Sequence, residues 1–145
     1  MKKIFSIILS LCLFGFAYGN AFTTDCGNTV SITATPVTGY HFTQWQDGNT
    51  DNPRQIEVKA NASYTASFAP NEYTIIFVNE DGTELQKSLL AYGTTPVYNG
   101  ATPTKPASAQ YTYTFAGWSP AIATVTANAT YTATYTSSVN SYTLT

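Results

Sequence analysis

The feature that most constrains this chain is an aromatic pattern that occurs twice. The stretch from Tyr111 to Tyr135 places Phe115 three residues before Trp118 and closes on Asn-Ala-Thr-Tyr-Thr-Ala-Thr-Tyr. The stretch from Tyr40 to Phe68 repeats this plan with Phe42, Trp45 and a closing Asn-Ala-Ser-Tyr-Thr-Ala-Ser-Phe. Rings that recur with a repeat are typical of a core, because each unit has to bury the same face. The sequence therefore predicts two related structural modules.

Residues 1–19 have the organisation of a secretory signal peptide. Lys2 and Lys3 precede an apolar run that ends at Phe16 and is too short to span a bilayer. Small residues then precede a cleavage site that we place after Gly19. Lipid attachment is the weaker alternative, because neither cysteine follows a small residue. We therefore expect a secreted or surface-exposed protein with no membrane segment after cleavage.

The composition of the processed chain limits its function. Removal of Lys2 and Lys3 leaves four basic against eight acidic residues, a formal charge of −4. An acidic chain does not attract a polyanion, so nucleic-acid binding is disfavoured. Charged residues make up 10% of the sequence, against about a quarter in ordinary globular domains. Cys26 is the single cysteine left, so we expect no intrachain disulfide and no nucleophile with an activating base.

Alternating apolar and polar residues predict antiparallel β-strands in a first module, residues 20–70. The loop from Asp47 to Pro53 is polar and rich in turn residues, and Pro36 to Gly39 supplies another turn. The expected strands cover Val30–Thr35, Tyr40–Trp45, Gln55–Lys59 and Tyr64–Phe68.

A second module is predicted over residues 71–138. Tyr73–Asn79 is apolar on both faces, which predicts a central strand, and Asp81-Gly82 is a strong hairpin signal. Thr83–Ala91 fits either a strand with an irregularity or a short helical turn. A connection rich in proline then leads to strands at Tyr111 and at Tyr131–Thr136. Residues 139–145 fit the start of a further repeat or a terminal strand.

Strict alternation would place each Trp on the opposite face from the Phe three residues before it. Either a β-bulge returns the Trp to the core, or the Trp leaves the strand and covers a sheet edge. Gly117 suits a bulge, whereas Gln44 at the matching position does not require one. We predict that Trp45 and Trp118 are both mostly buried.

These residues carry a family resemblance. The motifs Tyr73-Thr-Ile-Ile-Phe-Val-Asn-Glu-Asp-Gly82 and Phe115-Ala-Gly-Trp118 resemble a Listeria–Bacteroides repeat of the internalin B-repeat type. The first module, with Trp45-Gln-Asp-Gly48, is similar to the divergent repeat that accompanies it. The resemblance implies a mostly β fold of two small tandem antiparallel modules, the second β-grasp-like with at most one short helix. It implies a bacterial spacer, stalk or adhesive segment, with no catalytic residue and no cofactor.

Three motifs could carry chemistry, but each has a simpler structural interpretation. His41 is the single histidine and has no partner in sequence that would make it a general base. Asp47, Asn49 and Asp51 alternate as in calcium loops, yet Asn52 and Val58 replace the Gly and Glu of an EF-hand. Two glycosylation-like Asn-Ala-Ser/Thr motifs, at residues 61 and 128, fit a repeated turn. We therefore expect no enzyme activity and no metal.

Two binding alternatives remain. Trp45, Trp118, Tyr111 and Tyr113 could form an aromatic platform that stacks on sugars, which would make the chain a carbohydrate-binding module or an accessory part of a larger secreted enzyme. The uncharged strand Tyr131–Thr136, if it lies at a sheet edge, could pair with another strand. Candidate partners are other repeats of the same chain, surface proteins and glycans.

Overall fold

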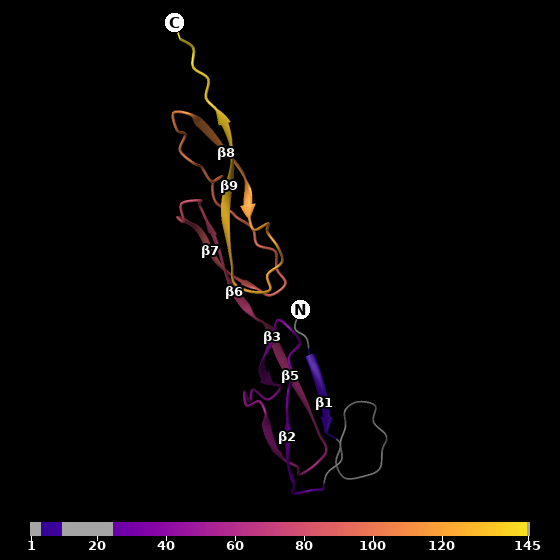
Figure 1. Ribbon diagram of the computed structural model, residues 1–145. Coiled ribbons are helices and arrows are strands. Elements are labelled where there is room, and N and C mark those ends of the chain that lie inside the picture. Colours follow the sequence, from indigo (N-terminus) through magenta and orange to yellow (C-terminus); the bar gives the residue numbers. More distant parts are fainter. Residues whose placement is uncertain (1–3, 10–24, 145) are drawn as a thin grey trace. The chain divides into compact units, whose positions relative to one another are not determined.

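The computed structural model describes residues 4–9 and 25–144, and within these ranges it contains strands and no helix (Figure 1). The mostly β fold class is therefore confirmed. The chain divides into two compact units, residues 1–71 and 72–145. Strand β1 (Ile4–Leu9) falls within the predicted signal peptide, whereas residues 1–3 and 10–19 of that peptide lie outside the described residues.

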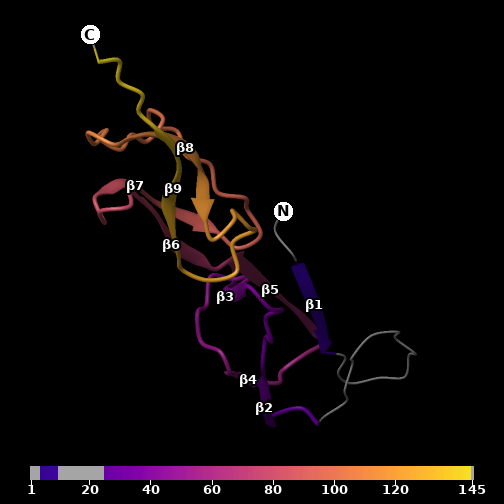
Figure 2. The same ribbon diagram turned by 45° about the horizontal axis from the view of Figure 1, so that its top comes forward.

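The described residues of the first unit form two sheets. One has the strand order β1-β5-β3, in which β5 (Ala62–Pro70) pairs antiparallel with both β1 and β3 (Tyr40–Trp45), and Figure 2 shows β1 alongside β5. The other sheet pairs β2 (Thr29–Ile32) with β4 (Arg54–Glu57). The buried side chains of both sheets form one core cluster: Ile32, Ala34, Trp45, Ile56, Val58, Ala66 and Phe68.

The second unit is a single four-stranded sheet with the order β7-β6-β9-β8 (Figure 2). Strand β6 (Glu72–Val78) is internal, as its apolar faces predict, and buries Ile75 and Phe77. The ambiguous segment after the Asp81-Gly82 turn is a strand, β7 (Glu84–Ala91), with an irregularity opposite Phe77 and Val78. The remaining strands are β8 (Tyr111–Ser119) and β9 (Ala129–Val139).

The expectation that Tyr131–Thr136 forms an edge strand is wrong. β9 pairs antiparallel with β8 and also parallel with β6, from Ile75 opposite Ala129 to Val78 opposite Thr132. The edges of this sheet are β7 and β8. Local alternation does not specify which strand lies alongside, and the parallel partner of β9 is contributed by the start of the same unit.

Of the two alternatives that the sequence left open for each Trp, the structure contains the β-bulge in both units. In the first unit Phe42 pairs with Phe68 and Gln44 with Ser67, so Thr43 is the extra residue. In the second unit Phe115 pairs with Tyr135 and Gly117 with Thr134, so Ala116 is the extra residue. One extra residue shifts the alternation by one position and returns the Trp to the face of the preceding Phe.

Energetics favour the bulge. An unpaired ladder position costs about 1 kcal/mol of net hydrogen bonding. Burying an indole of roughly 200 Å² at about 25 cal/mol per Å² contributes on the order of 5 kcal/mol. The aromatic rings then contact each other, with centroids 5.4 Å apart for Phe42 and Trp45 and 5.3 Å apart for Phe115 and Trp118.

The two units share a second arrangement of backbone hydrogen bonds, in which a glycine and the residue after it are bonded to a buried valine. The Gly27 N–H donates to the Val58 carbonyl at 2.8 Å, and the Val58 N–H donates to the Asn28 carbonyl at 2.9 Å. The second unit has the same pair of bonds. The Gly93 N–H donates to the Val125 carbonyl at 2.9 Å, and the Val125 N–H donates to the Thr94 carbonyl at 2.8 Å. Gly27 and Gly93, and likewise Val58 and Val125, therefore hold equivalent places in the two units.

We predict that Gly117→Ala destabilises the second unit by about 1–3 kcal/mol. The φ of Gly117 is +136°, which L-residues rarely adopt, and an added Cβ meets no atom within 4 Å. The penalty is therefore conformational rather than steric. Urea denaturation followed by Trp fluorescence measures it.

The control is Gln44→Ala at the matching, exposed position of the first bulge, which should change the free energy of unfolding by less than about 0.5 kcal/mol. Equal effects of the two substitutions would contradict a special requirement for glycine at residue 117.

Candidate functional site

The predicted aromatic platform does not form as one surface, because the two Trp side chains point into their cores. Trp45 is 0% exposed, which confirms the burial prediction for this residue. Its indole N–H donates to the Asp51 carbonyl at 2.7 Å. Phe42 and Tyr64 contact its ring. An indole enclosed in this way has no free face on which a ligand could stack.

Trp118 is half-buried and packs against the core of the second unit. Its ring centroid lies 4.7 Å from that of Phe77, 5.0 Å from that of Tyr98 and 5.3 Å from that of Phe115. Edge-to-face pairs of this kind each contribute about 0.5–1.5 kcal/mol beyond area burial. The ring is thus held by its neighbours, and only part of it reaches solvent.

Tyr111 and Tyr113 lie together on β8, on the same face of this edge strand and further from the core. Both are half-buried, and their ring centroids are 6.4 Å apart. The Lys105 ammonium sits 4.4 Å from the centroid of the Tyr113 ring. Of the predicted platform, these two tyrosines remain the residues with adjacent, partly accessible rings.

A polar cluster beside Tyr113 is not predictable from any motif. The Lys105 ammonium pairs with the Glu80 carboxylate at 2.6 Å, and this interaction raises the pKa of Lys105. Tyr135 donates its hydroxyl to the Asn79 side-chain oxygen, and burial raises the pKa of that phenol. The cluster unites the β6–β7 turn, the proline-rich connection and β9, which are distant in sequence. Within the cluster, Glu80 lies beside the Asp81-Gly82 turn that the sequence predicts, whereas the positions of Lys105 and Tyr135 relative to it do not follow from the sequence.

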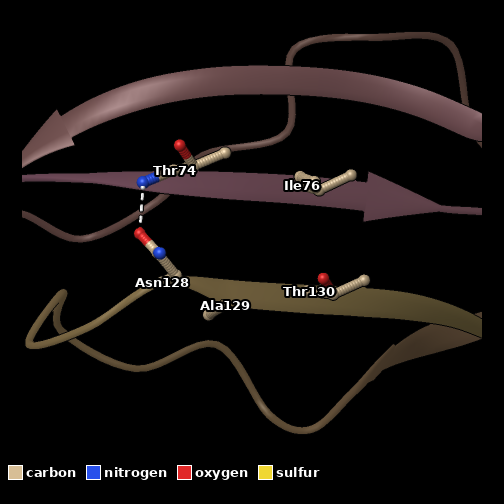
Figure 3. A pocket seen from close by; sticks show the side chains of 5 residues that line it. All are labelled: Thr74, Ile76, Asn128, Ala129 and Thr130. Atoms are coloured by element: carbon tan, nitrogen blue, oxygen red, sulfur yellow. Dashed lines mark hydrogen bonds between the residues drawn. The ribbon is translucent and has the colours of Figure 1, made fainter.

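A shallow depression of about 250 Å³ lies between the first residues of β6 and β9. Figure 3 shows that Thr74, Ile76 and Thr130 present their side chains on one side of the two strands. The Asn128 side-chain oxygen accepts a hydrogen bond from the Thr74 N–H at 2.8 Å, which ties the two strands together. The lining, completed by Ala129, has no titratable group, so it supplies no acid or base.

The loop that resembles a calcium site is held by its own side chains. Asp47 accepts a hydrogen bond from the Asn49 N–H at 3.2 Å, and the Asn49 side-chain oxygen accepts one from the Asp51 N–H at 2.9 Å. The Arg54 guanidinium binds both Asp47 carboxylate oxygens, at 2.8 and 2.7 Å. The Arg54 hydrogen bonds lower the pKa of Asp47. The alternating acids thus form consecutive Asx turns.

The remaining titratable candidates, His41 and Cys26, are exposed residues of the first unit. His41 Nδ1 lies 2.9 Å from the Asn71 side-chain oxygen on the surface of the first unit, and Cys26 is exposed. Among the described residues, no group of three or more His, Cys, Asp or Glu side chains is arranged to hold a metal ion. No helix long and apolar enough to cross a bilayer occurs in the described ranges.

Comparison with known families supports the repeat type of the first unit. Residues 15–72 match the family model described as the divergent InlB B-repeat domain. No curated protein and no solved structure matches the chain. This repeat family is not a known enzyme family. The match is consistent with a β-repeat segment of a surface protein.

We predict that the pairing of Asp47 with Arg54 makes the first unit acid-sensitive. Because the pKa of Asp47 is lower in the folded than in the unfolded chain, the pairing stabilises the fold above the unfolded pKa, near 3.9, and is lost as the pH falls through the folded pKa. Asp47→Asn keeps the side-chain oxygen but removes the charge. The substituted unit should therefore lose less stability between pH 7 and pH 3.

The control is Glu57→Gln, which removes an equal charge from an ion pair whose side chains are 75% and 58% exposed. Solvent screens this pair, so the pH profile should change little. Thermal unfolding at several pH values measures all three proteins. A profile for Asp47→Asn that is parallel to the unsubstituted protein would contradict the prediction.

Proposed function

We propose that this chain is a non-enzymatic secreted or cell-surface repeat protein that acts as a spacer, stalk or adhesive segment. The observation that carries the proposal is the orientation of the repeated aromatic motif. In both units a bulge directs the Trp toward the core, so the most recurrent part of the sequence builds the scaffold. The match of residues 15–72 to a divergent InlB B-repeat domain supports the same class.

The organisation of the chain also supports this function. Each unit has its own cluster of buried residues: the first is centred on Trp45, and the second on Ile75 and Phe77. Units with separate cores can be repeated along a chain without redesign, because each one buries its own apolar face. The predicted signal peptide would deliver such an array to the cell exterior, where a core held by packing needs no disulfide.

Carbohydrate recognition is the second candidate, and one observation favours it. Tyr111 and Tyr113 present adjacent rings on an edge strand, and the Lys105 ammonium and Glu80 carboxylate beside them add polar groups. Such a pair could stack on a sugar and hydrogen-bond its hydroxyls. In this case the chain would adhere through β8 rather than serve only as a spacer.

We predict that the processed protein shows no saturable binding on a glycan array if it is a spacer. The discriminating variant is Tyr111→Ala with Tyr113→Ala, and the matched control is Thr114→Ala, whose exposed side chain lies on the opposite face of β8. Saturable binding that is lost in the double variant and kept in the control would establish the carbohydrate alternative. Binding lost in a folded Trp118→Ala variant would likewise overturn the pure spacer role.

A separate prediction concerns export. The mature protein should begin at Asn20 and be found in the culture medium or at the cell surface, because residues 1–19 carry the charge and hydrophobicity of a signal peptide. Mass spectrometry of the N-terminal peptide, together with accessibility to added protease in intact cells, measures this. An intact N-terminus on a protein retained in the cytoplasm would contradict it.

A further inference from the structure

The strand beside β5 differs from the strand beside its counterpart β9. In the second unit β9 lies between β8 and β6, and β6 belongs to the folded unit itself. In the first unit β5 lies between β3 and β1, and β1 belongs to the predicted signal peptide. β1 covers Ala62 to Ser67 in antiparallel register, with Ile7 opposite Tyr64.

After the predicted cleavage, the first unit would keep too few residues before Gly27 to form a strand equivalent to β6. Gly27 and Gly93 make equivalent backbone bonds, so the β6–β7 hairpin, which ends just before Gly93, corresponds to residues before Gly27. Cleavage after Gly19 leaves a few residues there, too few for a hairpin the length of residues 72–91. Among the described residues, β1 is the strand that pairs with this edge of β5, so removal of β1 would take away the partner of the edge.

The backbone of Tyr64 points toward this edge. The Ser63 carbonyl accepts a hydrogen bond from the Gln46 side chain at 2.7 Å, and the Thr65 N–H donates to the same side chain at 2.9 Å. Both groups therefore face β3. Because a trans peptide directs its N–H and C=O in opposite directions, the N–H and C=O of Tyr64 both face away from β3. They form an exposed donor and acceptor pair once β1 is absent.

We propose that, after removal of the signal peptide, the β5 edge pairs with the β5 edge of a second copy of this chain. The two strands run antiparallel about a two-fold axis at Tyr64, so that Tyr64 pairs with Tyr64 of the second copy and Ala62 pairs with Ala66. In each of these pairs the residues exchange two backbone hydrogen bonds. This interface would form whether the repeat acts as a spacer or as an adhesive segment.

Three features of β5 favour a second copy as the occupant. The edge accepts an antiparallel strand over these residues in the structure, as β1 shows (Figure 1). A two-fold axis at Tyr64 pairs even-numbered residues with even-numbered ones. Because opposite residues have their side chains on the same face of a sheet, the core faces of both copies lie on the same side. The strand from Ala62 to Ser67 has no charge and no proline, so no like charges meet and nothing blocks pairing.

The first test measures oligomeric state. The secreted protein that begins at Asn20 should dimerise in sedimentation velocity at concentrations from about 1 to 100 μM, the range in which modest interfaces associate. The full chain, expressed without export so that residues 1–19 remain, should stay monomeric because β1 covers the edge. A processed protein that stays monomeric throughout would overturn the proposal, as would equal dimerisation of the full chain.

The second test reports the register. The axis at Tyr64 places Ser63 of one copy opposite Thr65 of the other in a pair without hydrogen bonds, where the Cα atoms are close enough for a disulfide. In a Cys26→Ser background, Ser63→Cys with Thr65→Cys should form a disulfide-linked dimer under mild oxidation. The matched control is Thr130→Cys with Thr132→Cys, at the corresponding positions of β9, where β6 covers the edge.

The control protein should stay monomeric on a non-reducing gel. Equal cross-linking of the two proteins would overturn the assignment to β5, because the second unit has no uncovered edge at that place. Ser63→Cys alone should cross-link poorly, since Ser63 does not face Ser63 of the second copy in this register. Efficient cross-linking of that single variant would contradict the axis at Tyr64.

Discussion

The β-bulge that precedes each Trp is the constraint on which both units depend. A strand that alternates strictly would direct Phe42 and Trp45 to opposite faces, and one of two large rings would be lost from a small core. The extra residue, Thr43 in one unit and Ala116 in the other, puts both rings on one face. The remaining aromatic residues of each core then pack around this pair, including Tyr64 in the first unit and Phe77 in the second.

This inward orientation also decides what the aromatic residues can do. A planar ring binds a sugar only when one of its faces reaches solvent, and Trp45 has no exposed area. Trp118 is held among Phe77, Tyr98 and Phe115. The sequence pattern that first indicated a binding platform therefore describes a scaffold in large part, and Tyr111 and Tyr113 on β8 are the members of the predicted platform whose partly accessible rings lie next to each other.

The candidate site was predictable in part. The repeat of Phe and Trp and the turn character of Asp47 to Asp51 follow from local sequence, and the structure contains both; of the two alternatives for each Trp, the structure decides for the bulge. The contacts of Lys105 with Glu80 and Tyr113 do not follow from it. Lys105 lies in a connection without periodicity, so its neighbours depend on how that connection crosses the sheet.

The sequence by itself determined the strand class, the central position of β6 and the parity conflict between each Trp and the Phe three residues before it. These properties depend on side-chain period and burial, which a few neighbouring residues specify. Only the tertiary structure decided which strands lie side by side. β9 is internal because β6 pairs with it in parallel, and β5 has β1 in the corresponding place. Backbone hydrogen bonds between distant strands are nearly independent of side-chain identity, so local sequence does not name the partner.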